Sequence, residues 1–195
     1  MRASSARPLP VSLADRRPPL LTVGMVLFLG SELMFFAALF AMYFTLRAQA
    51  PEWPPAGVDL DPWPPAFFTS LLVISSGTMQ LAVRRIRAGD AAGMRAWIFV
   101  TGLLALAFLG GQVREWATAG FEISSSAYGS AFYTMTGFHA LHVAAGLILM
   151  MVVLGRAPAG AYSGREHAGV EAATYYWHFV DAVWIAMFST IFLLG

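Results

Sequence analysis

The sequence contains no cysteine and no lysine, and only 12% of its 195 residues are charged. The absence of cysteine excludes disulfide bonds, thiolate metal sites and covalent haem attachment through a C-x-x-C-H motif. A soluble domain usually carries about a quarter charged residues, whereas 58% of this chain is hydrophobic. A net charge of +1 gives no electrostatic basis for nucleic-acid binding. The composition therefore indicates a protein whose main solvent is the lipid bilayer.

Five apolar stretches are long enough to cross a membrane, for which an α-helix needs about 20 residues. They cover residues 20–46, 66–83, 97–113, 128–154 and 173–194. We therefore predict an all-α integral membrane protein with a bundle of five transmembrane helices, forming one domain over residues 20–195. Residues 1–19 are rich in Arg, Pro and Ser, and we expect a short cytoplasmic tail with no cleaved signal peptide.

The arginines predict the orientation of this bundle. Most of them lie in the tail and in the second and fourth connections, namely Arg2, Arg7, Arg16, Arg17, Arg84, Arg85, Arg87, Arg95, Arg156 and Arg165. The first and third connections have only Arg47 and Arg114, which stand beside acidic residues. Since basic residues gather on the cytoplasmic side, we expect the N-terminus inside and the C-terminus outside.

Glu32 lies near the middle of the first predicted span, within GMVLFLGSELMFF. An ionisable group at this depth is costly, and such groups usually face protein or a water-filled cavity. Two interpretations remain open. Glu32 could handle protons or face a partner, with Phe35 and Phe36 packing against lipid or a partner subunit. It could instead be a structural carboxyl that is hydrogen-bonded between helices.

The fourth span carries the motif GFHALHVAAG, in which His139 and His142 are three residues apart and share a helix face. Histidines at this spacing can chelate a metal, but hydrogen bonding between helices is the interpretation we prefer.

The fifth span carries Glu171, Tyr175, His178 and Asp181 at steps of four, three and three, which predicts one polar stripe. We expect a buried polar seam, or an interface with another subunit or with lipid, in preference to a catalytic site. His178 and Asp181 should pair with each other or with the fourth span. We expect no metal site, because bundle-type two-metal proteins use Glu-x-x-His pairs whereas Glu171 and His178 are seven apart.

Several motifs together resemble subunit III of the haem-copper respiratory oxidases, in its short five-helix bacterial form. The most specific are GFHALHVAAG and EHAGVEAATYYWHFVDAVWIAMF. SELMFF, GQVREW and FEISSSAYGSAFY also match, so that the resemblance covers residues 20–195. Larger members of that family have two further N-terminal helices, and phospholipid lies in the cleft that those two helices form with the rest.

The resemblance implies a non-catalytic subunit of a cytochrome c or quinol oxidase in the bacterial cell membrane. Subunits I and II would be its partners and would hold the haem and copper, while this chain would bind no cofactor except structural phospholipid. It would stabilise the complex and support proton uptake by subunit I, with Glu32 as the candidate for that role. Two alternatives stay open: a homologue associated with nitric oxide reductase, and an independent transporter or metal enzyme.

Overall fold

The structure is a computed structural model that describes residues 19–194, and it is all-helical over that range. Its long helices are α1 (Leu20–Gln49), α2 (Trp63–Arg87), α3 (Ala91–Thr118), α4 (Ala127–Arg156) and α5 (Ala168–Phe188). A π-helical turn, Ser189–Leu193, continues α5, and a short 3-10 turn, Ala157–Ala159, follows α4. The prediction of an all-α bundle of five apolar helices is confirmed. Apart from Pro19, the predicted tail lies outside the described residues.

The helix ends follow local sequence signals. Asp90 caps α3 by accepting a hydrogen bond from the Gly93 backbone nitrogen at 2.7 Å, and Ser126 caps α4 by accepting one from the Gly129 nitrogen. These side chains satisfy backbone donors that have no partner within the helix. Gly89 ends the turn after α2 with a φ of 80°, a conformation that L side chains rarely adopt.

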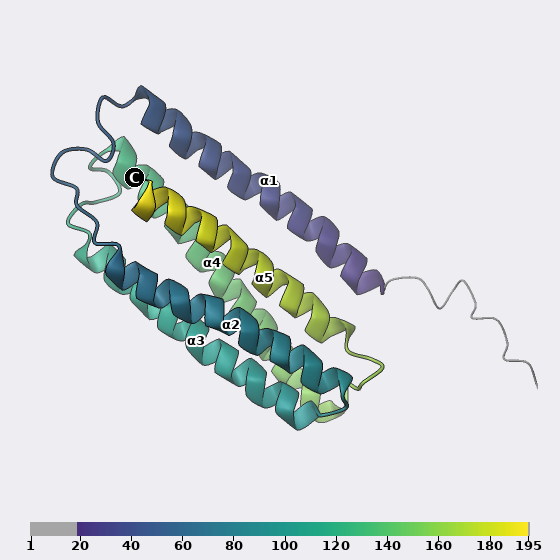
Figure 1. The fold of residues 1–195 in the computed structure, drawn as a ribbon. Helices are drawn as coiled ribbons and strands as arrows, with labels where there is room; N and C mark the ends of the chain where they lie inside the picture. The colour runs from purple at the N-terminus through teal and green to yellow at the C-terminus, as the bar shows by residue number, and fades with distance from the viewer. Residues whose placement is uncertain (1–18, 195) are drawn as a thin grey trace, which may run out of the picture.

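The helices form a bundle in which α5 is the central element (Figure 1). It packs against α1, α2 and α4, while α2 and α3 form a close pair joined by a short turn. Of the most apolar stretch of α5, 50% is buried, compared with 11% for α1. The helix α1 contacts the rest of the bundle mainly through α4 and α5.

The outer surface of the bundle is apolar, as a bilayer requires. Large side chains point outward along the helices, for example Met34 at 75% exposure on α1, Phe99 at 61% on α3 and Leu141 at 64% on α4. Polar side chains instead meet at helix–helix contacts, including those of Ser75, Thr101 and Thr136. This distribution identifies the chain as a membrane protein and directs attention to the polar contacts inside it.

Candidate functional site

Glu32 of α1 and His142 of α4 form a direct pair across two helices. The Glu32 Oε2 atom lies 2.9 Å from His142 Nε2. The two side chains are 20% and 16% exposed, so the pair is mostly buried but retains an opening at the bundle surface. A hydrogen-bond partner of this kind reduces the cost of placing a carboxyl group at hydrocarbon depth.

A second contact of His142 fixes one of its ring protons and limits where the other proton of the pair can lie. His142 Nδ1 lies 2.7 Å from the carbonyl oxygen of Phe138. Because a carbonyl only accepts hydrogen bonds, Nδ1 must carry a proton. The contact between His142 Nε2 and Glu32 then needs one further proton, which belongs either to the carboxyl or to the ring. In both cases the pair has no net charge, and it can hold that proton on either partner.

Aromatic residues surround the pair inside the bundle. Phe36 is buried, with its ring centroid 4.8 Å from that of His142 and 6.3 Å from that of Phe179 on α5. The expectation that Phe36 packs against lipid or a partner subunit is therefore wrong. Tyr176 of α5 donates a hydrogen bond to the His142 carbonyl at 3.0 Å. Three helices thus meet at one histidine.

His139, one turn before His142, has a different environment. It is fully buried, and neither ring nitrogen has a hydrogen-bond partner within the described residues. Its ring stacks on Trp184 of α5 at 4.8 Å and meets the edges of Phe36 and Phe108. The predicted interhelical hydrogen bond is formed by His142 and not by His139, whose contacts are aromatic.

The polar residues of α5 meet α2 and not α4. The Ser76 hydroxyl of α2 donates to Asp181 Oδ2, and His178 Nδ1 lies 2.9 Å from Ser76 Oγ. Since the hydroxyl proton goes to Asp181, His178 donates to Ser76 through Nδ1–H. Gln80 adds a longer contact of 3.4 Å between its side-chain amide and His178 Nε2, in which the amide NH2 group is the donor because this ring nitrogen carries no proton.

Two expectations for this stripe are corrected. His178 and Asp181 do not bond to each other or to α4 within the described residues, because Ser76 lies between them. Tyr175 is 42% exposed and does not belong to the buried seam, whereas Asp181 is 5% exposed. The reason is helical geometry. At about 100° per residue, positions 175 and 181 differ by about 120° around the axis, so one faces outward and the other inward.

Further polar contacts follow the α2–α5 interface toward both of its ends. Toward the C-terminal end of α5, Trp184 donates to Thr69 at 2.8 Å, and in the middle Trp177 donates to Ser75 at 2.9 Å. At the opposite end Arg87 and Glu171 form an ion pair at 2.5 Å. His167 Nε2 also lies 3.2 Å from Glu171 Oε1. The interface thus carries polar contacts along most of its length, which fix the register of α2 against α5.

Sequence reasoning missed the α2 side of this interface. Ser76 and Gln80 are ordinary residues within SLLVISSGTMQLAV, and no spacing marks them as partners of α5. Arg87 was recognised only as part of the arginine pattern. One signal was present, since the adjacent Ser75 and Ser76, together with Gln80, are costly in a largely apolar span and favour a contact with another helix.

The described residues contain no group of three or more His, Cys, Asp or Glu side chains that could hold a metal ion. The histidines do not converge on one point. His142 contacts Glu32, His167 contacts Glu171 and His178 contacts Ser76, while His139 is enclosed by aromatic rings. The arrangement is suited to joining helices and to holding a proton at the Glu32–His142 pair.

Comparison with known proteins gives a consistent result. Residues 19–195 match the family described as cytochrome c oxidase subunit III. A "probable cytochrome c oxidase subunit 3" from Nocardia farcinica is 45% identical over 182 residues, which is 91% of this chain and 90% of the relative. A "cytochrome c oxidase subunit 3" from Thermostichus vulcanus is 38% identical, covering 94% of this chain and 92% of that protein. One from Synechocystis is 41% identical, with 91% and 77% covered.

Proposed function

This chain belongs to the cytochrome c oxidase subunit III family, and from that premise we propose that it is a non-catalytic subunit of a bacterial terminal oxidase. It lies in the plasma membrane, where it binds subunits I and II, stabilises the complex and supports proton uptake by subunit I. The haem and copper centres belong to those partner subunits. The single observation that carries the proton role is the Glu32–His142 pair at the α1–α4 contact.

The pair supports this role because its two partners share one proton without creating net charge. A proton taken up or released at the pair changes its charge by one, and both side chains remain partly exposed at the outer surface of the bundle. The Phe138 carbonyl fixes the ring orientation, and Tyr176 holds the backbone of the same turn. The pair is therefore a preorganised proton-holding site within the membrane.

A cavity beside the N-terminal end of α1 supports the proposal that the chain binds structural phospholipid. It has a volume of about 440 Å³ and lies between the start of α1 and the connection from α4 to α5. Arg156 and Arg165 line it, and both can contact a phosphate, while Leu21 supplies an apolar wall. Glu166 also lines the cavity, so the site favours a headgroup that carries hydrogen-bond donors together with its phosphate.

Copurification tests the proposed function. An affinity-tagged chain, extracted from membranes in mild detergent, should retain the haem-containing oxidase subunits in fixed proportion. After dissociation, the isolated chain should have no haem absorbance and no stoichiometric copper. Copurification with an unrelated set of proteins, or haem retained by the isolated chain, would contradict the proposal.

A further inference from the structure

Two polar side chains of the motif GQVREW, Gln112 and Glu115, lie inside the bundle near the end of α3. They are 5% and 9% exposed. The amide nitrogen of Gln112 is enclosed, and it has no hydrogen-bond partner among residues 19–194. Native structures rarely leave a buried donor without an acceptor. The amide therefore requires an acceptor that these residues do not provide.

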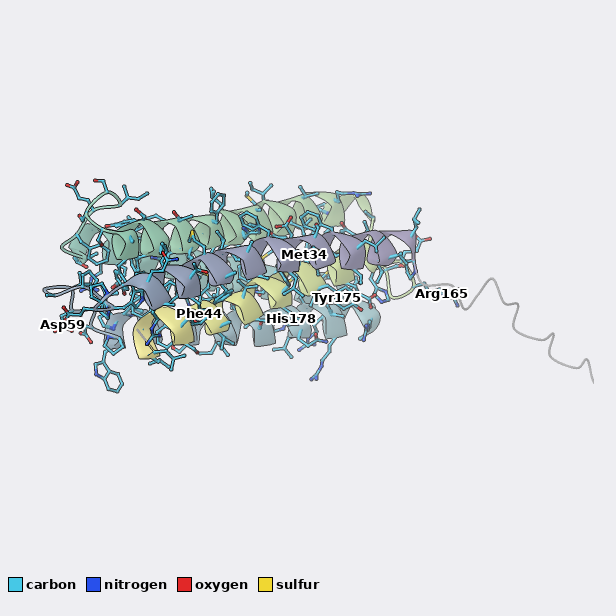
Figure 2. The ribbon with its side chains drawn as sticks, turned by 90° about the horizontal axis from the view of Figure 1, so that it is seen from above. Met34, Phe44, Asp59, Arg165, Tyr175 and His178 are labelled. Carbon is cyan, nitrogen blue, oxygen red and sulfur yellow. The ribbon has the colours of Figure 1, made fainter. Side chains whose placement is uncertain are left out.

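A small cavity lies beside these two side chains, between α2, α3 and α5. Its other lining residues are Pro65, Phe68, Phe108, Gly111 and Trp184. All of the lining residues except Phe68 are buried, so the cavity lies within the protein and not on its lipid-facing surface. It is near the start of α2 and the end of α3, toward the end of the bundle that Asp59 marks in Figure 2, opposite Arg165. It is therefore separate from the arginine-lined cavity at the start of α1.

The cavity has the size and the polarity of a site for one water molecule. Its volume is about 10 Å³, and a single water needs roughly 10 to 15 Å³. Water can accept a hydrogen bond from the Gln112 amide and at the same time donate one to the Glu115 carboxyl. Because water both donates and accepts, it suits the charged and the neutral form of that carboxyl. The indole N–H of Trp184 takes no part, since it donates to Thr69.

Other occupants fit this cavity less well. A lipid chain is too large for a volume of about 10 Å³. A calcium ion needs six to eight oxygen ligands, and only two of the lining side chains, those of Gln112 and Glu115, carry oxygen atoms. Cavities that stay empty are apolar, whereas an amide and a carboxyl line this one. The lining therefore favours water.

We propose that one water molecule is bound in this cavity as part of the fold and bridges the Gln112 amide to the Glu115 carboxyl. The bridge supplies the acceptor that Gln112 lacks and gives Glu115 a partner where α2, α3 and α5 meet. A Cβ atom added at Gly111 would collide with the Phe68 ring, so α2 and α3 close tightly over this site. The inference does not depend on the proposed function, because every lining residue belongs to this chain.

A cryo-EM map of the membrane complex that contains this chain tests the assignment, at a resolution that reveals ordered waters. One peak should lie in the cavity at about 2.6 to 3.2 Å from the Gln112 side-chain amide and from a Glu115 carboxyl oxygen. Each of three other results would overturn the proposal: an empty cavity, a direct bond between Gln112 and Glu115, or a side chain of another subunit in this space. A peak with several oxygen ligands at about 2.0 to 2.6 Å would identify a metal ion and would overturn it as well.

Variants then identify the groups that hold the water. Gln112→Met keeps a similar length and removes the donor, and it should lose the peak. Glu115→Gln keeps a polar partner and should retain it. Gly110→Ala is the control, because this position is exposed and has open space around it, and the peak should remain. A peak that persists unmoved in Gln112→Met, or one that disappears in Gly110→Ala, would contradict a bridge built on Gln112. If a variant does not assemble, the wild-type map alone decides.

Discussion

At the scale of single side chains, one substitution can separate the structural role of the Glu32–His142 pair from its proton-handling role. Glu32→Gln keeps the shape and can still donate a hydrogen bond to His142 Nε2, but it removes the exchangeable proton. We expect near-normal assembly and a loss of sustained turnover mainly at alkaline pH, where protons are scarce. Oxygen consumption by the intact complex across pH measures this. Superimposable profiles for wild type and variant would leave Glu32 with a structural role alone.

Asp181 provides a second residue-level prediction. Asp181→Ala leaves the Ser76 hydroxyl without its acceptor and disturbs the contact to His178, which should destabilise the protein by about 1 to 3 kcal/mol. Asp181→Asn retains a carbonyl acceptor and should cost less. Thermal inactivation of the purified complex compares the two variants. If Asp181→Ala matches wild type in heat stability, the α2–α5 contact at Ser76 does not hold the helices together.

The residues of the site were only partly predictable from the sequence. A carboxyl in an apolar span is costly, so Glu32 could be recognised alone, but its partner is 110 residues away and is fixed only by packing. The three-residue spacing of His178 and Asp181 correctly predicted that the two side chains lie close together on one helix. It could not reveal that Ser76 of another helix lies between them, because serine in an apolar helix gives no strong signal of its partner.

At the scale of helices, the α4–α5 contact depends on one glycine. A Cβ atom added to Gly146 would lie 2.7 Å from the Trp177 ring, which is buried and cannot move freely. Gly146→Ala should therefore destabilise the bundle by about 1 to 3 kcal/mol through overpacking. Gly137, also on α4, has nothing within 4 Å and provides the control. Thermal unfolding in detergent should separate the two variants, and equal stability would show that α4 and α5 can shift apart without cost.

The positions of the helices were predictable, but their ends were less so. Hydropathy reveals only the part of a helix that lies in hydrocarbon, and α2 and α3 extend beyond it at both ends. Arg84, Arg85 and Arg87 continue α2 because arginine is a good helix former, although it is strongly polar. The extensions at these ends place Arg87 where it meets Glu171. The apolar pattern alone therefore could not reveal this ion pair.

At the scale of the whole molecule, the arginine distribution leads to a test of orientation. A fluorescent protein fused to the N-terminus should fold inside the cell, and a phosphatase fused to the C-terminus should be active outside. The physical reason is that basic connections are retained on the cytoplasmic side. Reporter activity for both ends on the same side of the membrane would contradict an arrangement in which five helices all cross the bilayer.

The packing of α1 also has a consequence for the order of biosynthesis. The chain is made from the N-terminus, so α1 is complete before α4 and α5, the two helices that it packs against, have been translated. At about 5 to 20 residues per second, Glu32 precedes His142 by about 5 to 20 s. During that interval the carboxyl has no histidine to bond with. The nascent helix therefore stays at the insertion machinery or in lipid without this partner, and it joins the bundle only when the last helices arrive.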